Sequence, residues 1–311
     1  MRYAFSTLGV PDLPPAEVAA LAADSGYQGV ELRCAPDEPV HPGLTQHDRH
    51  KVAEEFARAG VEILSVCGYT RVAAADDDTR VLHEIGELIW LARDLGASYV
   101  RVFPGADPEA GEAEIPGPRP VGSAGPMETG PLEAALPEEG SPDDGPVADE
   151  PRPFPRGADA LAARRLGRAA GTAASAGVRL LLETHDSHRT GVDVSRVLGP
   201  VGHRGAGALW DVLHPWLGGE DPAVTHAALA PFLGYVQVKD VAGPDDLTPL
   251  RLGAGAVPLA ACLAPLAPGT WISWEYEKRW YPGAAELPEL LVPGRIHLET
   301  LIAAVGAGGP V

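Results

Sequence analysis

The sequence predicts an α/β fold, a closed (β/α)8 TIM barrel of eight parallel strands with a long acidic insertion, rich in proline and glycine, after the fourth strand. Strand-like apolar runs alternate with helical segments eight times along the chain. The 311 residues suit one barrel of about 250 residues plus an insertion. The main alternative is a doubly wound open sheet, which is expected to carry a G-x-G-x-x-G turn after its first strand. This chain has no such turn there.

The eight strands are predicted from short runs rich in Val, Leu, Ile and aromatic residues. A parallel strand that is buried on both faces is expected to be apolar along its whole length. Turn-forming or charged residues bound each run. The runs span residues 3–9, 29–33, 61–69, 99–105, 178–185, 207–215, 235–240 and 271–278.

The helices are predicted from apolar residues at helical spacing and from the residues that begin and end them. Proline opens the first helix, and glycine ends several others. Leu82, Ile85, Ile89 and Leu95 form one apolar stripe that stops before Gly96. The predicted helices span residues 14–26, 45–60, 159–176, 192–199, 222–230, 257–265 and 285–305, and one more follows a cap region at residues 76–79 and ends at Leu95.

The insertion, residues 106–154, differs in composition from the rest of the chain. It holds twelve Asp or Glu against two Arg, and almost no β-branched or aromatic residues. Such a segment buries little surface, so we expect a flexible acidic insertion within a single barrel domain, residues 1–311. A role as a lid and a functionally silent, solvated loop both remain open.

The formal net charge of −19 argues against nucleic acid or an anionic membrane as partner, because both are bound by clustered Lys and Arg. The insertion carries −10 of this charge, which weakens the argument against small phosphate ligands. Three widely spaced cysteines and the lack of an apolar signal segment predict a cytoplasmic protein. No membrane-spanning segment is expected, since prolines break the uncharged stretch 253–274.

The last four predicted strands each carry one oxygen-bearing side chain near the carboxyl end: Glu183, Asp211, Gln237 and Glu275. An apolar run tolerates a carboxylate only when something offsets its desolvation, and a shared divalent cation does so for several converging acids. Strand ends meet at the catalytic face of a barrel, so the four predict a metal site. Oxygen ligands favour Mn or Mg, with Co or Zn as alternatives. The competing interpretation is a buried salt-bridge network with Lys239 and Arg101.

These motifs resemble the sugar isomerase and epimerase barrels typified by xylose-isomerase-like proteins. The resemblance rests on "FSTLG", "GVELR", "LLLETH", "LWDVLHP", "VQVKD", "RLGAGAVPL" and "WEYE", and excludes the insertion. It implies that Glu183, Asp211, Gln237 and Glu275 hold the metal, with Gln237 in place of the usual His, as in hydroxypyruvate-isomerase-like relatives. It also implies that Glu183 and Glu275 are the catalytic acid/base pair.

Three further residues are predicted to bind substrate. His185 lies two residues beyond Glu183 and so points the same way along the strand. His214 resembles the family's D-x-x-H motif, and Lys239 resembles the Lys of its "VKD" signature. Lys239 has alternative roles as a cation that neutralises the site or pairs with Asp240 or Glu275.

The expected function is that of a divalent-metal-dependent isomerase or epimerase of a sugar or small hydroxycarbonyl compound, by proton transfer through a metal-stabilised enediolate. A metal-dependent dehydratase of the inosose type and a non-catalytic sugar-binding barrel are the alternatives. A DNA-repair endonuclease on a related barrel is disfavoured, because strands two and three end in "LRCAP" and "VCGY" without His ligands. The substrate, the metal and the oligomeric state are left open, and a homo-oligomer is among the arrangements that the sequence allows.

Overall fold

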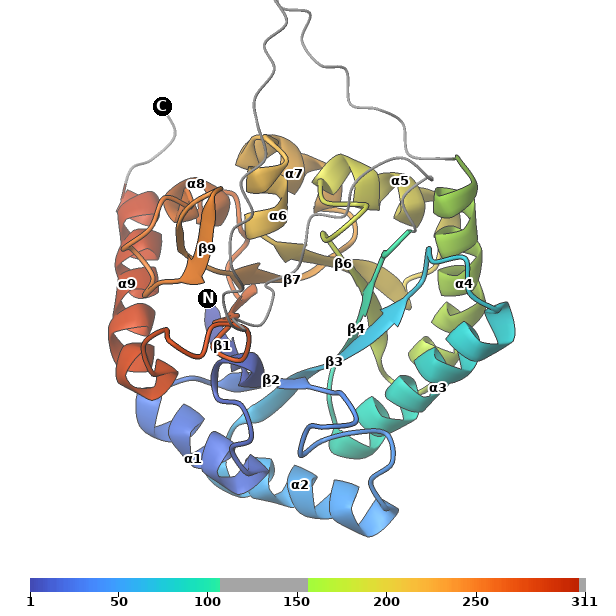
Figure 1. The fold of residues 1–311 in the computed structure, drawn as a ribbon, viewed down its shortest axis with the longest axis horizontal. Helices are drawn as coiled ribbons and strands as arrows, with labels where there is room; N and C mark the ends of the chain where they lie inside the picture. The colour runs from blue at the N-terminus through green and yellow to red at the C-terminus, as the bar shows by residue number, and fades with distance from the viewer. Residues whose placement is uncertain (107–155, 308–311) are drawn as a thin grey trace, which may run out of the picture.

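The computed structural model describes residues 1–106 and 156–307, which form a closed barrel of eight parallel strands inside a ring of helices (Figure 1). Each barrel strand pairs with the next one along the chain, and the last strand, β10, pairs with β1. The predicted fold class is therefore confirmed. The barrel strands are β1 (Arg2–Ser6), β2 (Gly29–Arg33), β3 (Glu62–Arg71), β4 (Tyr99–Phe103), β5 (Arg179–Glu183), β6 (Ala206–Asp211), β7 (Leu233–Val238) and β10 (Trp271–Trp274).

The helices begin and end where the sequence offers caps. The Thr45 hydroxyl accepts a hydrogen bond from the Asp48 backbone N–H at 3.2 Å before the second helix, and the Asp77 carboxylate does the same for Arg80 at 3.1 Å before the third. Gly96 ends the third helix at φ 73°, a conformation that costs glycine little. The helices are α1 (Pro15–Ser25), α2 (Gln46–Ala59), α3 (Asp78–Leu95), α4 (Arg156–Ser175), α5 (Gly191–Val201), α6 (Leu213–Leu217), α7 (Pro222–Leu229), α8 (Leu259–Leu263) and α9 (Leu287–Ala307).

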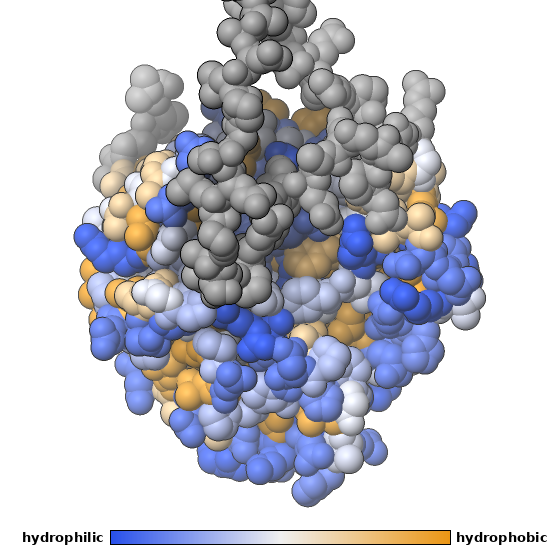
Figure 2. All heavy atoms as spheres, viewed as in Figure 1, coloured by the Kyte–Doolittle hydropathy of each residue, from blue (hydrophilic) through white to orange (hydrophobic). Residues whose placement is uncertain are grey.

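Two apolar cores hold the barrel together. The larger lies between the strands and the helices and includes Trp210 and Trp274, which are 1% and 0% exposed. The smaller fills the barrel interior and consists of Ala4, Leu64, Leu181, Leu209, Tyr235 and Trp271. On the outside, polar residues cover much of the visible surface (Figure 2). The strands are thus buried on both faces, which explains their near-continuous apolar sequences.

Three short elements differ from the prediction. A 3-10 turn, Thr7–Gly9, follows β1, and helix α6 follows β6. A small antiparallel hairpin of β8 (Val241–Gly243) and β9 (Asp246–Pro249) follows β7. Elements of three to five residues show too little periodicity to be predicted from sequence. Nearly all of the predicted insertion, 106–154, lies outside the described residues.

The loop after this hairpin is held by one buried carboxylate, that of Asp240. Its oxygens accept hydrogen bonds from the backbone N–H groups of Gly253 at 2.8 Å, Gly255 at 3.0 Å and Val257 at 3.3 Å, and from that of Val241 at 3.1 Å. Asp240 is 2% exposed. A single side chain therefore accepts from three backbone donors of the loop and from one at the start of β8.

Replacing Asp240 with alanine is expected to lower the free energy of unfolding by about 2–4 kcal/mol, because several buried N–H groups lose their acceptor at once. Urea unfolding followed by circular dichroism measures the loss. Asp245→Ala, an exposed change in the same segment, is the control and should stay within about 0.5 kcal/mol of the parent. A loss below about 1 kcal/mol for Asp240→Ala would show that the loop is held by other contacts.

Candidate metal centre

The alternation of side chains along the strands brings the candidate ligands to one level of the barrel. Residues two apart on a strand point to the same side. Leu181, Leu209 and Tyr235 belong to the interior core, so the residues two positions later on β5, β6 and β7 also face inward. These residues are Glu183, Asp211 and Gln237, and Glu275 follows β10 at the same end of the barrel.

Three of the predicted ligands converge. Glu183, Asp211 and Glu275 each offer a carboxylate oxygen, and these atoms lie within 4.8 Å of one another. The three residues are 1%, 0% and 5% exposed. Three buried acids this close repel one another unless cations compensate them. We refer to these residues as the carboxylate trio.

Lys239 supplies one of the compensating cations. Its ammonium nitrogen lies 2.8 Å from Asp211 Oδ2 and 2.6 Å from Glu275 Oε2. It also lies 2.6 Å from Glu277 Oε1, outside the trio. Burial alone would lower the pKa of Lys239, but Asp211 and Glu275 outweigh it and raise that pKa well above the ordinary value. Lys239 is therefore positively charged at this site. Of the two predicted partners, the structure pairs Lys239 with Glu275 and not with Asp240.

Arg101 on β4 compensates the other side of the trio. Its Nη1 lies 2.9 Å from Glu183 Oε2, and both side chains are buried. The guanidinium stacks on the Phe103 ring, 3.9 Å from its centroid, and faces Tyr69 at 5.2 Å. These contacts hold Glu183 in one orientation. The salt-bridge contacts of the competing interpretation are thus present around the trio.

Gln237 joins the trio through its amide nitrogen. This nitrogen donates to Glu31 Oε2 at 2.8 Å and lies 3.3 Å from Glu275 Oε1. The amide oxygen of Gln237 has no hydrogen-bond partner among the described residues. The structure therefore places Gln237 against the trio and leaves its oxygen free, and its ligation of a metal stays a prediction.

Glu31 on β2 is a site residue that the sequence reasoning missed. It is 0% exposed and lies next to Gln237. Its signal was the same as that of the other acids, a lone carboxylate inside the apolar run "GVELR". The predicted ligands lie on the last four strands of the barrel, whereas Glu31 lies on the second.

Negative charge exceeds positive charge in this cluster. Burial, together with the charge of Glu275, raises the pKa of Glu31 to about 7. Burial also raises the pKa of Glu183 to about 8, although Arg101 opposes the shift. Burial would raise the pKa of Glu275 as well, but Lys239 and Arg101 hold it below the ordinary value. Two cations do not fully compensate the acids, so the cluster favours a further positive charge.

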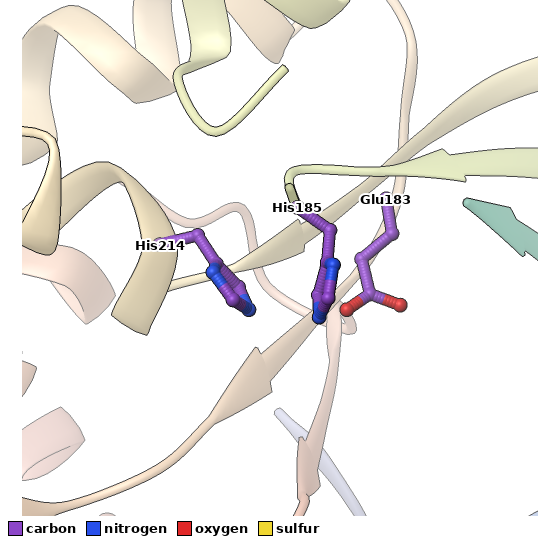
Figure 3. Close-up of side chains that lie close together, drawn as sticks. All are labelled: Glu183, His185 and His214. Carbon is purple, nitrogen blue, oxygen red and sulfur yellow. The ribbon is translucent and has the colours of Figure 1, made fainter. Parts of the chain in front are cut away.

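The two predicted substrate-binding histidines lie beside the trio. The ring centroids of His185 and His214 are 4.1 Å apart, and Figure 3 shows both side chains beside that of Glu183. The His185 ring also contacts the Phe103 ring, with the two centroids 4.4 Å apart. His214 Nε2 lies 3.6 Å from Asp211 Oδ2. The structure thus brings His185, His214 and Lys239 to the trio, and their contact with a substrate stays a prediction.

Comparison with solved structures shows the same fold in several proteins. The "IOLI protein with a binding zinc atom" is 15% identical with a TM-score of 0.71, covering 98% of this chain and 99% of that one. D-Psicose 3-epimerase with D-tagatose from Clostridium cellulolyticum H10 is 11% identical with a TM-score of 0.70, covering 97% and 99%. A probable 3-DHS dehydratase of petrobactin synthesis from Bacillus anthracis is 16% identical with a TM-score of 0.67, covering 96% and 99%.

Two findings complete the comparison. None of the curated proteins is similar enough to count as a match. Among the described residues, no helix is long and apolar enough to cross a membrane. The family model for the xylose isomerase-like TIM barrel matches residues 19–121 and 138–293, which is most of the chain. The closed parallel barrel and this match together show that the chain belongs to the xylose isomerase-like TIM barrel family.

Proposed function

We propose that the protein is a divalent-metal-dependent isomerase or epimerase of a sugar or a small hydroxycarbonyl compound. The observation that carries the proposal is the convergence of Glu183, Asp211 and Glu275 within 4.8 Å at the carboxyl end of the strands. In barrels of this type, that end is the catalytic face. D-Psicose 3-epimerase, with the same fold, was crystallised with the sugar D-tagatose, which supports a small polyhydroxylated substrate.

The residues present fit a divalent ion. Glu183 Oε1 and Gln237 Oε1 are buried oxygens without a hydrogen-bond partner in the described part of the chain. Buried oxygens of this kind are expected where a bound cation is their partner. All four proposed ligands offer oxygen, which favours Mn or Mg over softer ions. Glu277 gives Lys239 a partner outside the trio, so Asp211 and Glu275 are not needed to hold the lysine.

The chain's own residues have distinct roles in this proposal. A divalent ion would polarise a carbonyl and its neighbouring hydroxyl and stabilise the negative charge that develops when a C–H proton is removed. Glu183 and Glu275 remove and return that proton, and Arg101 holds Glu183 in position. His185, His214 and Lys239 bind the substrate hydroxyls.

Dehydration on the same site is the second candidate. Loss of a hydroxyl group needs an acid that protonates it. Burial opposes protonation of His185, but Asp186 and Glu183 outweigh burial and raise its pKa above the ordinary value. His185 beside the trio is thus a suitable proton donor for a leaving hydroxyl. This observation supports an inosose-type dehydratase as the second candidate.

The test uses protein stripped of metal and reloaded with Mn²⁺ or Mg²⁺, incubated with ketoses and small hydroxycarbonyl acids in deuterated water. Metal-dependent deuterium incorporation beside the carbonyl, followed by NMR and without loss of water, supports the isomerase or epimerase. A dehydrated product supports the lyase. Binding of a sugar without exchange or turnover, with any of the metals, would overturn both and indicate a binding barrel.

A further inference from the structure

We propose that the amino end of the barrel carries a binding site for a small organic anion, a carboxylate or phosphate group attached to an apolar body. A cavity of about 420 Å³ lies there, a volume typical of small-molecule sites. Two arginines and one histidine line it, and none of its lining residues is acidic. We call this cavity the basic pocket; its walls include Arg179, Leu198, His203, Arg204, Pro231 and Phe232.

The basic pocket lies at the opposite end of the barrel from the carboxylate trio. Arg179 is the first residue of β5 and Glu183 is the last. Phe232 directly precedes β7, so it lies at the same amino end of the strands. Four residue steps along a strand separate the backbones of Arg179 and Glu183 by about 13 Å. A ligand of the basic pocket therefore binds apart from the substrate of the proposed function.

Arg179 is held in one orientation without an acidic partner among the described residues. Its Nε donates to the carbonyl of Ala206 at 3.2 Å, its Nη1 to that of Leu233 at 3.0 Å and its Nη2 to that of Phe232 at 2.7 Å. Burial lowers the pKa of Arg179, Tyr99 opposes the shift, and no carboxylate contributes to it. A guanidinium has five N–H groups, so two of them remain for a ligand.

A glycine on β6 makes room for this guanidinium. A Cβ atom at Gly207 would lie 2.5 Å from Arg179 Cζ and 2.5 Å from the Phe232 carbonyl oxygen. A side chain at this position would therefore displace the guanidinium from the ends of β6 and β7. The arginine is thus built into the pocket wall, which reduces the entropy that it loses when a ligand binds.

His203 and Arg204 supply further donors. His203 Nδ1 accepts a hydrogen bond from the backbone N–H of Gly205 at 2.9 Å. This bond places the proton of the neutral ring on Nε2, which can donate it to a ligand. Arg204 is exposed, and its guanidinium makes no hydrogen bond or ion pair within the described part of the chain. Both side chains can therefore turn toward an anion at little cost.

The pocket is positive although the end of a helix lies beside it. Helix α5 ends at Val201, and a helix carboxyl end carries a partial negative charge of about half an elementary charge. Arg179 and Arg204 carry two full positive charges. The basic pocket therefore attracts anions within a chain whose formal net charge is −19.

The rest of the wall is apolar and selects an organic anion over a bare inorganic one. Leu198, Val201, Pro231 and Phe232 line the cavity, and Leu198 is 2% exposed. An inorganic ion would leave this apolar surface in contact with water, whereas a ring or short chain attached to the anion covers it. An arginine fork also matches the two oxygens of a carboxylate or phosphate group.

The experiment titrates the whole chain with benzoate and with phenyl phosphate and measures binding by isothermal titration calorimetry. We expect both anions to bind, and neutral benzyl alcohol to bind at least about tenfold more weakly, because it lacks the charge that the arginines recognise. The tighter of the two anions identifies the charged group that the pocket prefers. Affinity should be equal with and without Mn²⁺, since the basic pocket lies away from the trio.

Two variants locate the bound anion. Arg204→Gln should weaken binding about tenfold, the usual loss for one charged hydrogen-bond partner. Arg179→Lys keeps the charge but loses the planar fork, and it should weaken binding as well. Arg58→Gln, an exposed change on α2 with the same loss of charge, is the matched control and should bind as the parent does. Circular dichroism and thermal melting first establish that each variant folds.

Four results would overturn the proposal. The first is a parent that binds neither anion at millimolar concentration, and the second is benzyl alcohol that binds as tightly as the anions. The third is unchanged affinity in the folded Arg204→Gln and Arg179→Lys variants. The fourth is binding that requires Mn²⁺, which would place the anion at the trio. None of these measurements uses turnover, so failure here is distinct from failure of the proposed function.

Discussion

Glu275→Gln is expected to lower the rate of proton exchange between substrate and solvent by about 10²–10⁴-fold, the usual contribution of a positioned acid or base. Glutamine keeps the size of the side chain but cannot accept the substrate proton. Loss of the Glu275 charge should also weaken metal binding, because the trio then holds two carboxylates. Rates measured in deuterated water at saturating metal separate the loss of proton transfer from the loss of metal affinity.

Glu277→Gln is the matched control for this prediction. Glu277 contacts the same ammonium of Lys239 at 2.6 Å, yet it is not part of the trio. We expect the Glu277→Gln variant to exchange the substrate proton at a rate within about threefold of the parent rate, because Glu277 makes no contact with the reacting atoms in this proposal. Equal losses in the two variants would mean that both act through Lys239, and a catalytic role for Glu275 would then be wrong.

The metal-free protein is expected to lose stability as the pH rises from about 5 to about 8. In the folded protein the pKa of Glu31 is raised to about 7 and that of Glu183 to about 8, above the ordinary glutamate value of 4.5. Between these values the folded state binds more protons than the unfolded state, so the stabilisation is complete below pH 4.5 and is lost as the pH passes about 8. Between its unfolded and folded pKa values, each carboxyl lowers the free energy of unfolding by about 1.4 kcal/mol per pH unit as the pH rises.

Thermal melting across this pH range measures the effect. Added Mn²⁺ should restore more stability at pH 8 than at pH 5, because the ion binds the ionised carboxylates. Glu183→Gln should flatten the pH dependence, whereas Glu289→Gln, an exposed change on α9, should not. If the stability of the metal-free parent stays level or increases with pH, the raised pKa values of Glu31 and Glu183 are contradicted.

The barrel was predictable from sequence because each of its strands is an apolar run followed by an amphipathic helix. A parallel strand needs a crossover helix to reach its neighbour, so the order of elements along the chain already limits the topology. The 3-10 turn, α6 and the β8–β9 hairpin were missed because such short elements show no usable period. Asp240 shows the same limit, since its hydrogen bonds to the 253–257 loop depend on how the chain returns to the hairpin.

The positions of Glu183, Asp211 and Glu275 were predictable for a related reason. Strand alternation sets which side chains face inward, and parallel strands end at a common level. The partners of these residues were not predictable. The Gln237 amide nitrogen donates to Glu31 across 206 residues of sequence, and no local pattern reports such a contact.

The amino-acid sequence by itself determined the order of strands and helices and the end of the barrel where the acids gather, because periodicity and burial are local properties of the chain. Only the tertiary structure decided that Lys239 contacts Asp211 as well as Glu275, that Arg101 holds Glu183, and that His214 faces His185. These pairings depend on distances between side chains from different strands. Closure of the barrel sets those distances, and closure is a property of the whole fold.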